Sequence, residues 1–540
     1  TLSVIIELET HIKLKRWDFM YYFLNTTIPL NKSGIEHAQI KRVNLFNDSG
    51  VANKIVTRNF EVDLHHNLEV AGISEENHIN LFEFLQGSGD FKPRKFTAKD
   101  VKLPHGCKLR GDKGAATYTA KDLKGRIAVR IEPWSDHDAQ VQVVTYFDYA
   151  GNLLRRERYD HRGFKSIAEI HNPQGGVSSE QIFSPEGKLV YESFYFNDGQ
   201  GKVQNSLLRV VDFHGQDYEF TGLKGLQRFF FDQLNKVDDG HNIFISDRAV
   251  ETEWALLHMK TKAYKVLFLH NAHTADPNNP MDPVLNNNFE FSLDNFYDWN
   301  AVVDSTHRQT ADAKLRFDAK RTPIFTIPVG IVPNELMKKD KVRFTDRTLG
   351  KIIVVARLFP EKRLDHLVKA FAIVHKKLPQ TTLDFWGYGD GKTDKALEQQ
   401  VKELKLDDAV QFKGYTPNIG EIMDKAQVSV LTSRVEGFAL AVLEAQSHGL
   451  PVVAYDIPYG PSDIIEDDFS GKLVKDGDYK AFAKALIALM ENQDTLQKYS
   501  DNAYVSRERF SEKAIWKAWQ QLITDADRFF SEDLKNGEAK

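Results

Sequence analysis

Glycine recurs every twelve residues through the middle of the chain, at positions 151, 163, 175, 187 and 199. Each of the first four glycines follows, by three residues, a polar turn residue: Asp148, Asp160, Asn172 and Ser184. Asp, Asn or Ser at the first position of a turn, with Gly at the fourth, is typical of a type I β-turn. The runs between turns, such as LVYESFYF, are rich in aromatic and β-branched residues. This spacing predicts an antiparallel β-meander, built hairpin by hairpin, over residues 90–212.

On both sides of the meander the sequence alternates between strand and helix patterns. MYYFLNTTI, the helical IEHAQIKRVNLFNDSG and VANKIVTRNF read as the start of a βαβ unit. The alternation resumes after about residue 215, and it is clearest in KIIVVARL, LDHLVKAFAIVHKKL and TTLDFW. We therefore expect an α/β chain with two doubly wound, Rossmann-like domains that face a cleft.

The chain has 540 residues, too many for one hydrophobic core. The pattern predicts a first α/β domain in two parts, residues 1–89 and 213–335, with the β-rich insert at 90–212 between them. A second α/β domain is expected at 336–510, and a helix at 511–540 that returns to the first domain. The insert is expected to serve acceptor binding or oligomerisation, because its repeated strand edges invite assembly.

Composition excludes several classes of protein. Basic and acidic residues nearly balance, with a net charge of −5, so no nucleic-acid partner is expected. Cys107 is the one cysteine, which rules out an internal disulfide and fits a reducing cytoplasm. No apolar run is long enough for a membrane span. The start, TLSVIIELETHIKLKRWD, lacks a secretion signal; as an amphipathic helix it would touch a membrane peripherally or, the favoured alternative, pack on the first domain.

Two cations follow a predicted strand in VVARLFPEKR, namely Arg357 and Lys362. The carboxyl end of a parallel strand is where α/β sheets bind ligands. An arginine fork and a lysine point charge together suit a diphosphate. The alternative is a pair of solvated surface cations, which is what most Lys and Arg are.

Two carboxylates stand eight positions apart in SRVEGFALAVLEAQ, Glu436 and Glu444. On one helix they would point about 80° apart, so they would not line one face. We place Glu436 in the loop after the strand VSVL, with Gly437 opening a helix and Glu444 about two turns along it. The helix start offers backbone N–H groups as a second anion site. Glu444 suits vicinal ribose hydroxyls, unless it is merely an exposed helix position.

Together, R-x4-K and the E-x7-E of EGFALAVLE resemble the donor-site signature of retaining glycosyltransferases of family 4, which have the GT-B fold. NKSGIEHAQIKR, LHNAH and the β insert narrow the resemblance to Gram-positive α-glycosyltransferases that modify the poly(glycerol-phosphate) or poly(ribitol-phosphate) of wall teichoic acid. The enzyme that starts O-glycan chains on serine-rich adhesins is similar too. The resemblance covers nearly the whole chain from about Tyr21.

The resemblance implies a role for each matching residue. Arg357 and Lys362 would hold the donor diphosphate and stabilise charge on the leaving nucleotide. Glu444 would bind the ribose, and Glu436 the transferred sugar near its 3-hydroxyl. His270 would touch the 6-hydroxyl and place a backbone carbonyl near the reacting carbon, with His273 as the alternative. The remaining donor-site residues would be Gly34 in the first βα loop, Gly437, Phe438, Ala439, Leu440 and Tyr415.

Two positions depart from the family pattern. Many members have two adjacent glycines in the first loop, whereas here Ser33 precedes Gly34. Many read EGFG, whereas here the fourth residue is Ala439. A methyl group at 439 narrows the room around the sugar, so the choice between glucose and N-acetylglucosamine is left open.

The implied reaction is front-face transfer from a UDP-sugar with retention of configuration. The leaving phosphate oxygen would take the acceptor's proton. No metal is expected, because cationic side chains and a helix N-terminus neutralise the diphosphate. A retaining hydrolase ranks low, because it needs two carboxylates about 5 Å apart across the scissile bond.

The basic stretch RRERYDHRGFK, with Arg155, Arg156, Arg158, Arg162 and Lys165, indicates the acceptor. Possible acceptor-binding residues are Arg155, Arg156, Arg158 and His273. The stretch favours an anionic teichoic acid polymer running over the insert, and an ordinary charged hairpin face is the alternative. A serine-rich peptide is the second candidate acceptor. A non-catalytic GT-B binding partner ranks below both, because such relatives lose the donor residues that stand here. Teichoic-acid relatives form homotrimers through such an insert, so a homo-oligomer is expected.

Overall fold

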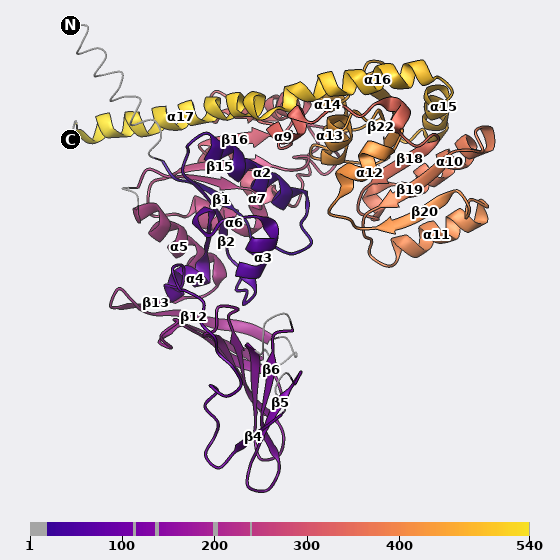
Figure 1. The fold of residues 1–540 in the computed structure, drawn as a ribbon. Helices are drawn as coiled ribbons and strands as arrows, with labels where there is room; N and C mark the ends of the chain where they lie inside the picture. The colour runs from indigo at the N-terminus through magenta and orange to yellow at the C-terminus, as the bar shows by residue number, and fades with distance from the viewer. Residues whose placement is uncertain (1–18, 112–114, 136–139, 198–202, 238–239, 539–540) are drawn as a thin grey trace. The chain divides into compact units, whose positions relative to one another are not determined.

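The computed structural model describes residues 19–111, 115–135, 140–197, 203–237 and 240–538 (Figure 1). The N-terminal segment, with the amphipathic helix and membrane contact expected of it, lies outside the described residues. The chain divides into two compact units, residues 1–263 and 264–540. Across the described ranges, every helix is too short or too polar to cross a bilayer.

The first unit contains a parallel α/β sheet whose strands lie in the order β14-β1-β2-β3. Its strands are β1 (Tyr21–Leu24), β2 (Asn53–Thr57), β3 (His78–Asn80) and β14 (Ile243–Ser246). Its helices are α2 (Gly34–Asp48), α3 (Leu64–Ala71), α4 (Leu81–Gln86), α5 (Leu223–Val237) and α6 (Ala249–Leu257). Because β14 is the next strand of this sheet after β3 and pairs with β1, the antiparallel strands between α4 and α5 form an insertion into this α/β fold, as predicted.

The insertion is a ten-stranded antiparallel meander in which each strand pairs with its neighbours in sequence. Its strands are β4 (Lys108–Arg110), β5 (Tyr118–Lys121), β6 (Ile127–Pro133), β7 (Val141–Phe147), β8 (Leu153–Tyr159), β9 (Lys165–His171), β10 (Val177–Phe183), β11 (Leu189–Asn197), β12 (Val203–Phe213) and β13 (Gln216–Phe220). The predicted meander is therefore confirmed, although its last strand lies beyond residue 212.

The twelve-residue repeat produces the turns for the reason expected. The N–H of Gly151 donates to the carbonyl of Asp148 at 3.1 Å, and the glycine has a φ of 90°. The Asp148 carboxylate accepts from the backbone N–H groups of Ala150 and Asn152, both at 2.8 Å. The left-handed φ recurs at Gly163, Gly175 and Gly187, where a side chain would be strained. Gly199, the fifth repeat, lies outside the described residues.

The second unit begins with three parallel strands in the order β15-β16-β17: β15 (Tyr264–Leu269), β16 (Ala301–Asp304) and β17 (Ile324–Thr326). The helices between and after them are α7 (Glu290–Asp294), α8 (His307–Arg316) and α9 (Asn334–Lys338). All three strands were predicted from their apolar runs. β15 and β16 are nearly fully buried, as strands covered on both faces should be.

A six-stranded parallel sheet follows in the same unit, in the order β20-β19-β18-β21-β22-β23. Its strands are β18 (Lys351–Val355), β19 (Thr382–Trp386), β20 (Val410–Gly414), β21 (Val428–Leu431), β22 (Val452–Asp456) and β23 (Gly471–Lys475). The helices are α10 (Leu364–Lys377), α11 (Thr393–Glu403), α12 (Ile419–Lys425), α13 (Leu440–Ser447), α14 (Pro461–Ile464), α15 (Tyr479–Met490) and α16 (Gln493–Ser506). The strand order is that of a doubly wound nucleotide-binding sheet, and it reverses between β18 and β21.

The chain ends in a long helix, α17 (Glu512–Glu538), drawn in yellow in Figure 1. The helix carries an apolar stripe that packs on β15: the ring of Trp519 is buried and lies 6.3 Å from the ring of Phe268. The hydroxyl of Tyr264, at the start of the same strand, donates to Asp525 at 2.5 Å. The tail thus returns to an earlier strand of the chain.

Candidate active site

The candidate site lies where the strand order of the six-stranded sheet reverses. Arg357 and Lys362 follow β18, and Glu436 follows β21, which is the neighbour of β18 in the sheet. The carboxyl ends of the strands at such a reversal point are where open α/β sheets bind ligands. The fold therefore places the two predicted cations and the predicted carboxylate together at this edge of the sheet.

Lys362 and Glu436 are in direct contact. The Lys362 Nζ lies 2.6 Å from Glu436 Oε1, and the side chains are 14% and 15% exposed. The hydroxyl of Ser433 donates to the same carboxylate oxygen at 2.6 Å. The backbone joins the loops as well, because the N–H of Arg434 donates to the carbonyl of Glu361 at 2.8 Å. The contact fixes the positions of a cation and an anion on two loops at once.

Arg357 is held more loosely than Lys362. Its side chain is 49% exposed, and its ion pair with Glu361 spans 3.3 Å. The guanidinium carbon lies 4.8 Å from the centre of the Phe359 ring, a cation–π contact. An exposed pair at this distance contributes little to stability, so the guanidinium is available to an anionic ligand.

Arg363 was missed by the sequence reasoning, although it immediately follows Lys362. Its backbone adopts a left-handed φ of 45° just before α10. From there the guanidinium donates to the carbonyls of Thr432, at 3.2 Å, and Ser433, at 2.7 Å, and pairs with Asp476. Arg363 thus holds the loop that carries Glu436 against the loop that carries Lys362. Nothing local in the sequence distinguishes it from its neighbour.

The segment after Glu436 differs from the prediction. Gly437 does not open a helix: α13 begins at Leu440, because Ala439 adopts left-handed φ and ψ angles of 66° and 58°. Glu444 therefore lies little more than one turn into α13. Phe438 and Ala439 are 4% and 5% exposed, so this segment can meet a ligand mainly through backbone groups.

Gly437 lies against the loop that follows β15. A Cβ at position 437 would stand 1.9 Å from the carbonyl oxygen of His270, so glycine is required by this close approach. His270 is partly exposed, and its ring stacks on that of Phe268 with centres 4.4 Å apart. The structure thus brings His270, the backbone at Gly437 and the Lys362–Glu436 pair into one neighbourhood.

His273, the alternative histidine, is in a different environment. It is fully buried, and its Nε2 lies 3.1 Å from the carbonyl oxygen of Pro280. Burial lowers the pKa of its imidazole, which favours the neutral form. These features describe a structural histidine, and they make His270 the better candidate for contact with a sugar.

The other predicted donor residues are less constrained. Glu444 is partly exposed, and its carboxylate has no hydrogen bond or ion pair with any described residue. Tyr415, which follows β20, is 47% exposed, and its ring centre lies 6.4 Å from that of Tyr388. Tyr388 follows the neighbouring strand β19, and the sequence reasoning did not single it out.

Gly34 belongs to the first unit, where it is the first residue of α2. Ser33, the residue before it, is the N-cap of this helix. Its hydroxyl accepts from the N–H of Ile35 and contacts Glu36 at 2.6 Å. Burial would raise the pKa of Glu36, but hydrogen bonds from Ser33, Arg248 and Asn25 and the charge of Arg248 lower it to about 2. The serine therefore has a capping role of its own.

The arginines of the basic stretch do not act together. Side chains alternate along β8, so Arg156 and Arg158 lie on one face of the meander and Arg155 on the other. Arg155 contacts the buried Glu157 at 3.3 Å and lies over the ring of Tyr146. Only two of the three predicted acceptor-binding arginines therefore share a surface. Within the described ranges, no group of three or more His, Cys, Asp or Glu side chains is arranged to hold a metal ion.

Residues 338–506 match the family model of the group 1 glycosyl transferases. This stretch contains the whole six-stranded sheet and the candidate site at its reversal point. The fold is the GT-B fold, as the sequence predicted, and residues 338–506 within it carry a group 1 glycosyl transferase domain.

Two kinds of enzyme are among the particular relatives. The chain is 25% identical, over 519 residues, to the poly(glycerol-phosphate) alpha-glucosyltransferase of Bacillus subtilis (strain 168), covering 93% of this chain and 74% of that protein. It is 26% identical, over 531 residues, to the UDP-N-acetylglucosamine–peptide N-acetylglucosaminyltransferase GtfA subunit of Streptococcus pneumoniae serotype 4, covering 93% and 99%. The crystal structure of the pneumococcal O-GlcNAc transferase GtfA in complex with UDP and GlcNAc matches with a TM-score of 0.77 and 23% identity, covering 94% and 99%.

Proposed function

We propose that this chain transfers glucose or N-acetylglucosamine from a UDP-sugar to hydroxyls of a wall teichoic acid poly(polyol-phosphate) chain, with retention of configuration. The observation that carries the proposal is the cluster at the reversal point: Arg357 and the Lys362–Glu436 pair, with the His270 carbonyl against Gly437. Similarity to a poly(glycerol-phosphate) glucosyltransferase along nearly the whole chain supports the choice of acceptor.

The proposed donor lies along the edge of the sheet where the strand order reverses. Arg357 and Lys362 bind the diphosphate, Glu436 binds the sugar, and Glu444 on α13 binds the ribose. The Lys362–Glu436 contact suits this order, because in a UDP-sugar the sugar carbon is bonded directly to a phosphate oxygen. A cation and a carboxylate that touch can hold the two sides of that bond.

In the proposed reaction the bond from the sugar C1 to the phosphate oxygen breaks. A bond from C1 to the acceptor oxygen forms on the same face, and the acceptor's proton passes to the leaving phosphate oxygen. Arg357 and Lys362 stabilise the charge that develops on UDP. These cations make the reaction independent of a metal in this proposal, and addition of a chelator tests that point.

A peptide acceptor is the second candidate. The similarity to a GtfA subunit is as extensive as the similarity to the poly(glycerol-phosphate) alpha-glucosyltransferase, and the GtfA subunit is a peptide N-acetylglucosaminyltransferase. Both candidate functions use the same donor site, and they differ in the acceptor that reaches it. We place the reaction in the cytoplasm, where a chain with one cysteine stays reduced, and propose a homo-oligomer assembled through the insert.

A transfer screen tests the proposal. UDP-glucose and UDP-N-acetylglucosamine are each incubated with poly(glycerol-phosphate), poly(ribitol-phosphate) or a serine-rich peptide, and UDP release is measured. We expect release with a polyol-phosphate polymer, its loss in Arg357→Ala, and no change with a chelator. Transfer to the peptide alone would establish the second candidate. Release that survives in Arg357→Ala would refute the diphosphate assignment.

A further inference from the structure

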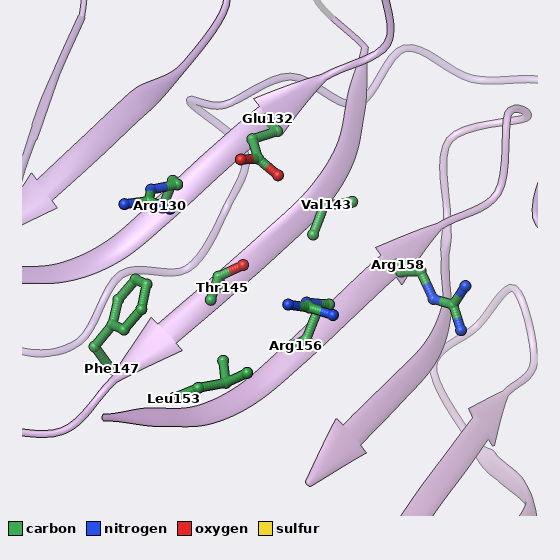
Figure 2. A pocket seen from close by; sticks show the side chains of 8 residues that line it. All are labelled: Arg130, Glu132, Val143, Thr145, Phe147, Leu153, Arg156 and Arg158. Carbon is green, nitrogen blue, oxygen red and sulfur yellow. The ribbon is translucent and has the colours of Figure 1, made fainter. Parts of the chain in front are cut away.

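The meander has a hollow of about 320 Å³ on one face of β6, β7 and β8 (Figure 2). We call it the insert hollow; its polar and aromatic lining comprises Arg130, Glu132, Thr145, Phe147, Arg156 and Arg158. The hollow belongs to the first unit, whereas the residues proposed to bind the donor, except Gly34, belong to the second. Nothing in the donor assignment explains why three arginines gather there.

The strand register aligns two of these arginines across a threonine. Thr145 on β7 is directly opposite Arg130 on β6 and directly opposite Arg156 on β8. Side chains that are opposite each other on adjacent strands point to the same face, with Cβ atoms about 5 Å apart. The row Arg130–Thr145–Arg156 therefore offers two guanidinium forks with a hydroxyl between them. Arginine side chains are long enough to converge above the threonine.

The charges of this row are only partly neutralised. Arg130 makes no ion pair with any residue in the described part of the chain, and its guanidinium carbon lies 5.5 Å from the centre of the Phe147 ring. Arg158 pairs with Glu169 at 2.7 Å and, in Figure 2, points away from Thr145. Arg156 is 3.8 Å from the same carboxylate and 43% exposed. Arg130 and Arg156 thus remain able to bind an anion.

The opposite face of β6 and β7 is buried. Val129, Ile131 and Val144, which alternate with the hollow-lining residues, are fully buried in a core cluster with Tyr118 and Tyr159. On β6 and β7 a ligand can therefore approach the arginine face, while the other face belongs to the interior of the insert. This arrangement separates a binding face from a structural face within single strands.

We propose that the insert hollow binds a phosphodiester group of the polymeric acceptor, held between Arg130 and Arg156 over the hydroxyl of Thr145. The choice of ligand rests on the proposed function, which supplies the polyol-phosphate polymer. Arginine forks match phosphate oxygens. The ring of Phe147 beside them gives the polymer's carbon chain an apolar surface. Glu132, at the other end of the hollow, disfavours a ligand that carries negative charge along its whole length. It suits a polymer whose phosphates are separated by neutral polyol.

The test measures binding of unglycosylated poly(glycerol-phosphate) to the full chain without donor, at low and at raised salt. We expect Arg130→Gln and Arg156→Gln each to weaken binding about tenfold, and the double variant more, since each removes charge-assisted hydrogen bonds. Lys124→Gln is the matched control, because it removes an exposed cation from the β5–β6 turn outside the hollow. It should bind as the unaltered chain does. Arg130→Lys, which keeps the charge without the fork, should fall in between.

Unchanged binding in the double variant, absence of polymer binding by the unaltered chain, or equal weakening in Lys124→Gln would each overturn the proposal. The proposal would also be overturned if the double variant lost its binding to a serine-rich peptide but kept its binding to the polymer. The transfer screen is an independent measurement: a chain that binds polymer through the hollow but transfers no sugar keeps this site and loses the proposed function. If the double variant still transfers sugar and binds the polymer with unaltered affinity, the proposed function stands and the insert hollow is not the binding site.

Discussion

The ammonium nitrogen of Lys362 lies 2.6 Å from Oε1 of Glu436, across 74 residues of sequence. Each residue belongs to a loop that leaves one of two neighbouring parallel strands, β18 and β21. The cation proposed to bind the diphosphate and the carboxylate proposed to bind the sugar therefore meet at the point where a donor's reactive bond would lie. The pairing also means that Glu436 reduces the charge that Lys362 can offer to a phosphate.

This competition predicts opposite effects on product binding and on transfer. In Glu436→Gln, Lys362 loses its partner, so UDP should bind several-fold more tightly. Transfer should fall about 100-fold, because the sugar loses its contact. In Lys362→Met both quantities should fall. Asp365→Asn, which removes an exposed carboxylate paired with Lys369, is the control and should change neither. Calorimetric titration with UDP and steady-state rates measure the two effects, and weaker UDP binding in Glu436→Gln would contradict the pairing.

The left-handed backbone at Ala439 predicts a stabilising substitution. An alanine at a φ of 66° is strained by contact of its Cβ with the backbone, and glycine is not. Ala439→Gly should raise the free energy of unfolding by about 1 kcal/mol. Ala441→Gly, two residues further and inside α13, should lower it by about 1 kcal/mol, since glycine disfavours a regular helix. Urea unfolding of both variants checks the pair, and a drop for both would show that residue 439 is unstrained.

Much of the fold could be predicted because its signals are local. A turn needs Asp148 and Gly151 only three residues apart, and the twelve-residue period repeats that signal along the meander. Buried parallel strands such as β15 and β16 are apolar throughout, so their positions are evident as well. The position of Arg357, Lys362 and Glu436 at one edge of the sheet was predictable because each follows such a strand.

What escaped prediction depends on contacts between distant segments or on backbone angles. Arg130 joins Arg156 only through the register of three strands, 26 positions apart, and the sequence does not show the register. In the sequence EKR nothing distinguishes Arg363 from Lys362. Its φ and its carbonyl partners, which only the structure shows, reveal its role. That Arg155 and Arg156 lie on opposite faces could have been predicted, since strand residues alternate between faces. A count of basic residues in the stretch conceals this difference.

His270 and His273 should respond differently to removal. His270→Ala should lower kcat/KM about tenfold, as expected for a lost hydrogen bond to a sugar hydroxyl. A donor without that hydroxyl, UDP-6-deoxyglucose, should show no further loss in this variant. His273→Ala should instead destabilise the chain by about 2 kcal/mol, because it empties a buried site and leaves the Pro280 carbonyl without its partner. A donor-independent loss of rate in His270→Ala would assign that residue a structural role.

The carboxyl group of Asp304, at the end of β16, predicts a pH dependence of stability. The residue is fully buried, and neither carboxyl oxygen has a hydrogen-bond partner in the described chain. Burial raises the pKa of Asp304 to about 7, and the nearby hydroxyl of Thr310 and the charge of Lys314 offset this only in part. In the unfolded chain the group ionises near its usual pKa of 3.8. Stability from this group is therefore complete below that value and is lost as the pH rises towards about 7.

Asp304→Asn should remove this dependence. The amide is neutral at every pH, so the variant and the unaltered chain should have similar unfolding free energies near about pH 4. Near about pH 8 the unfolding free energy of the variant should exceed that of the unaltered chain by up to about 4 kcal/mol. Asp294→Asn, at an exposed carboxylate at the end of α7, should follow the unaltered chain at both values. Urea unfolding across this range measures the difference. Equal slopes against pH for Asp304→Asn and the unaltered chain would mean that Asp304 is ionised in the folded protein, with a cation from some other segment beside it.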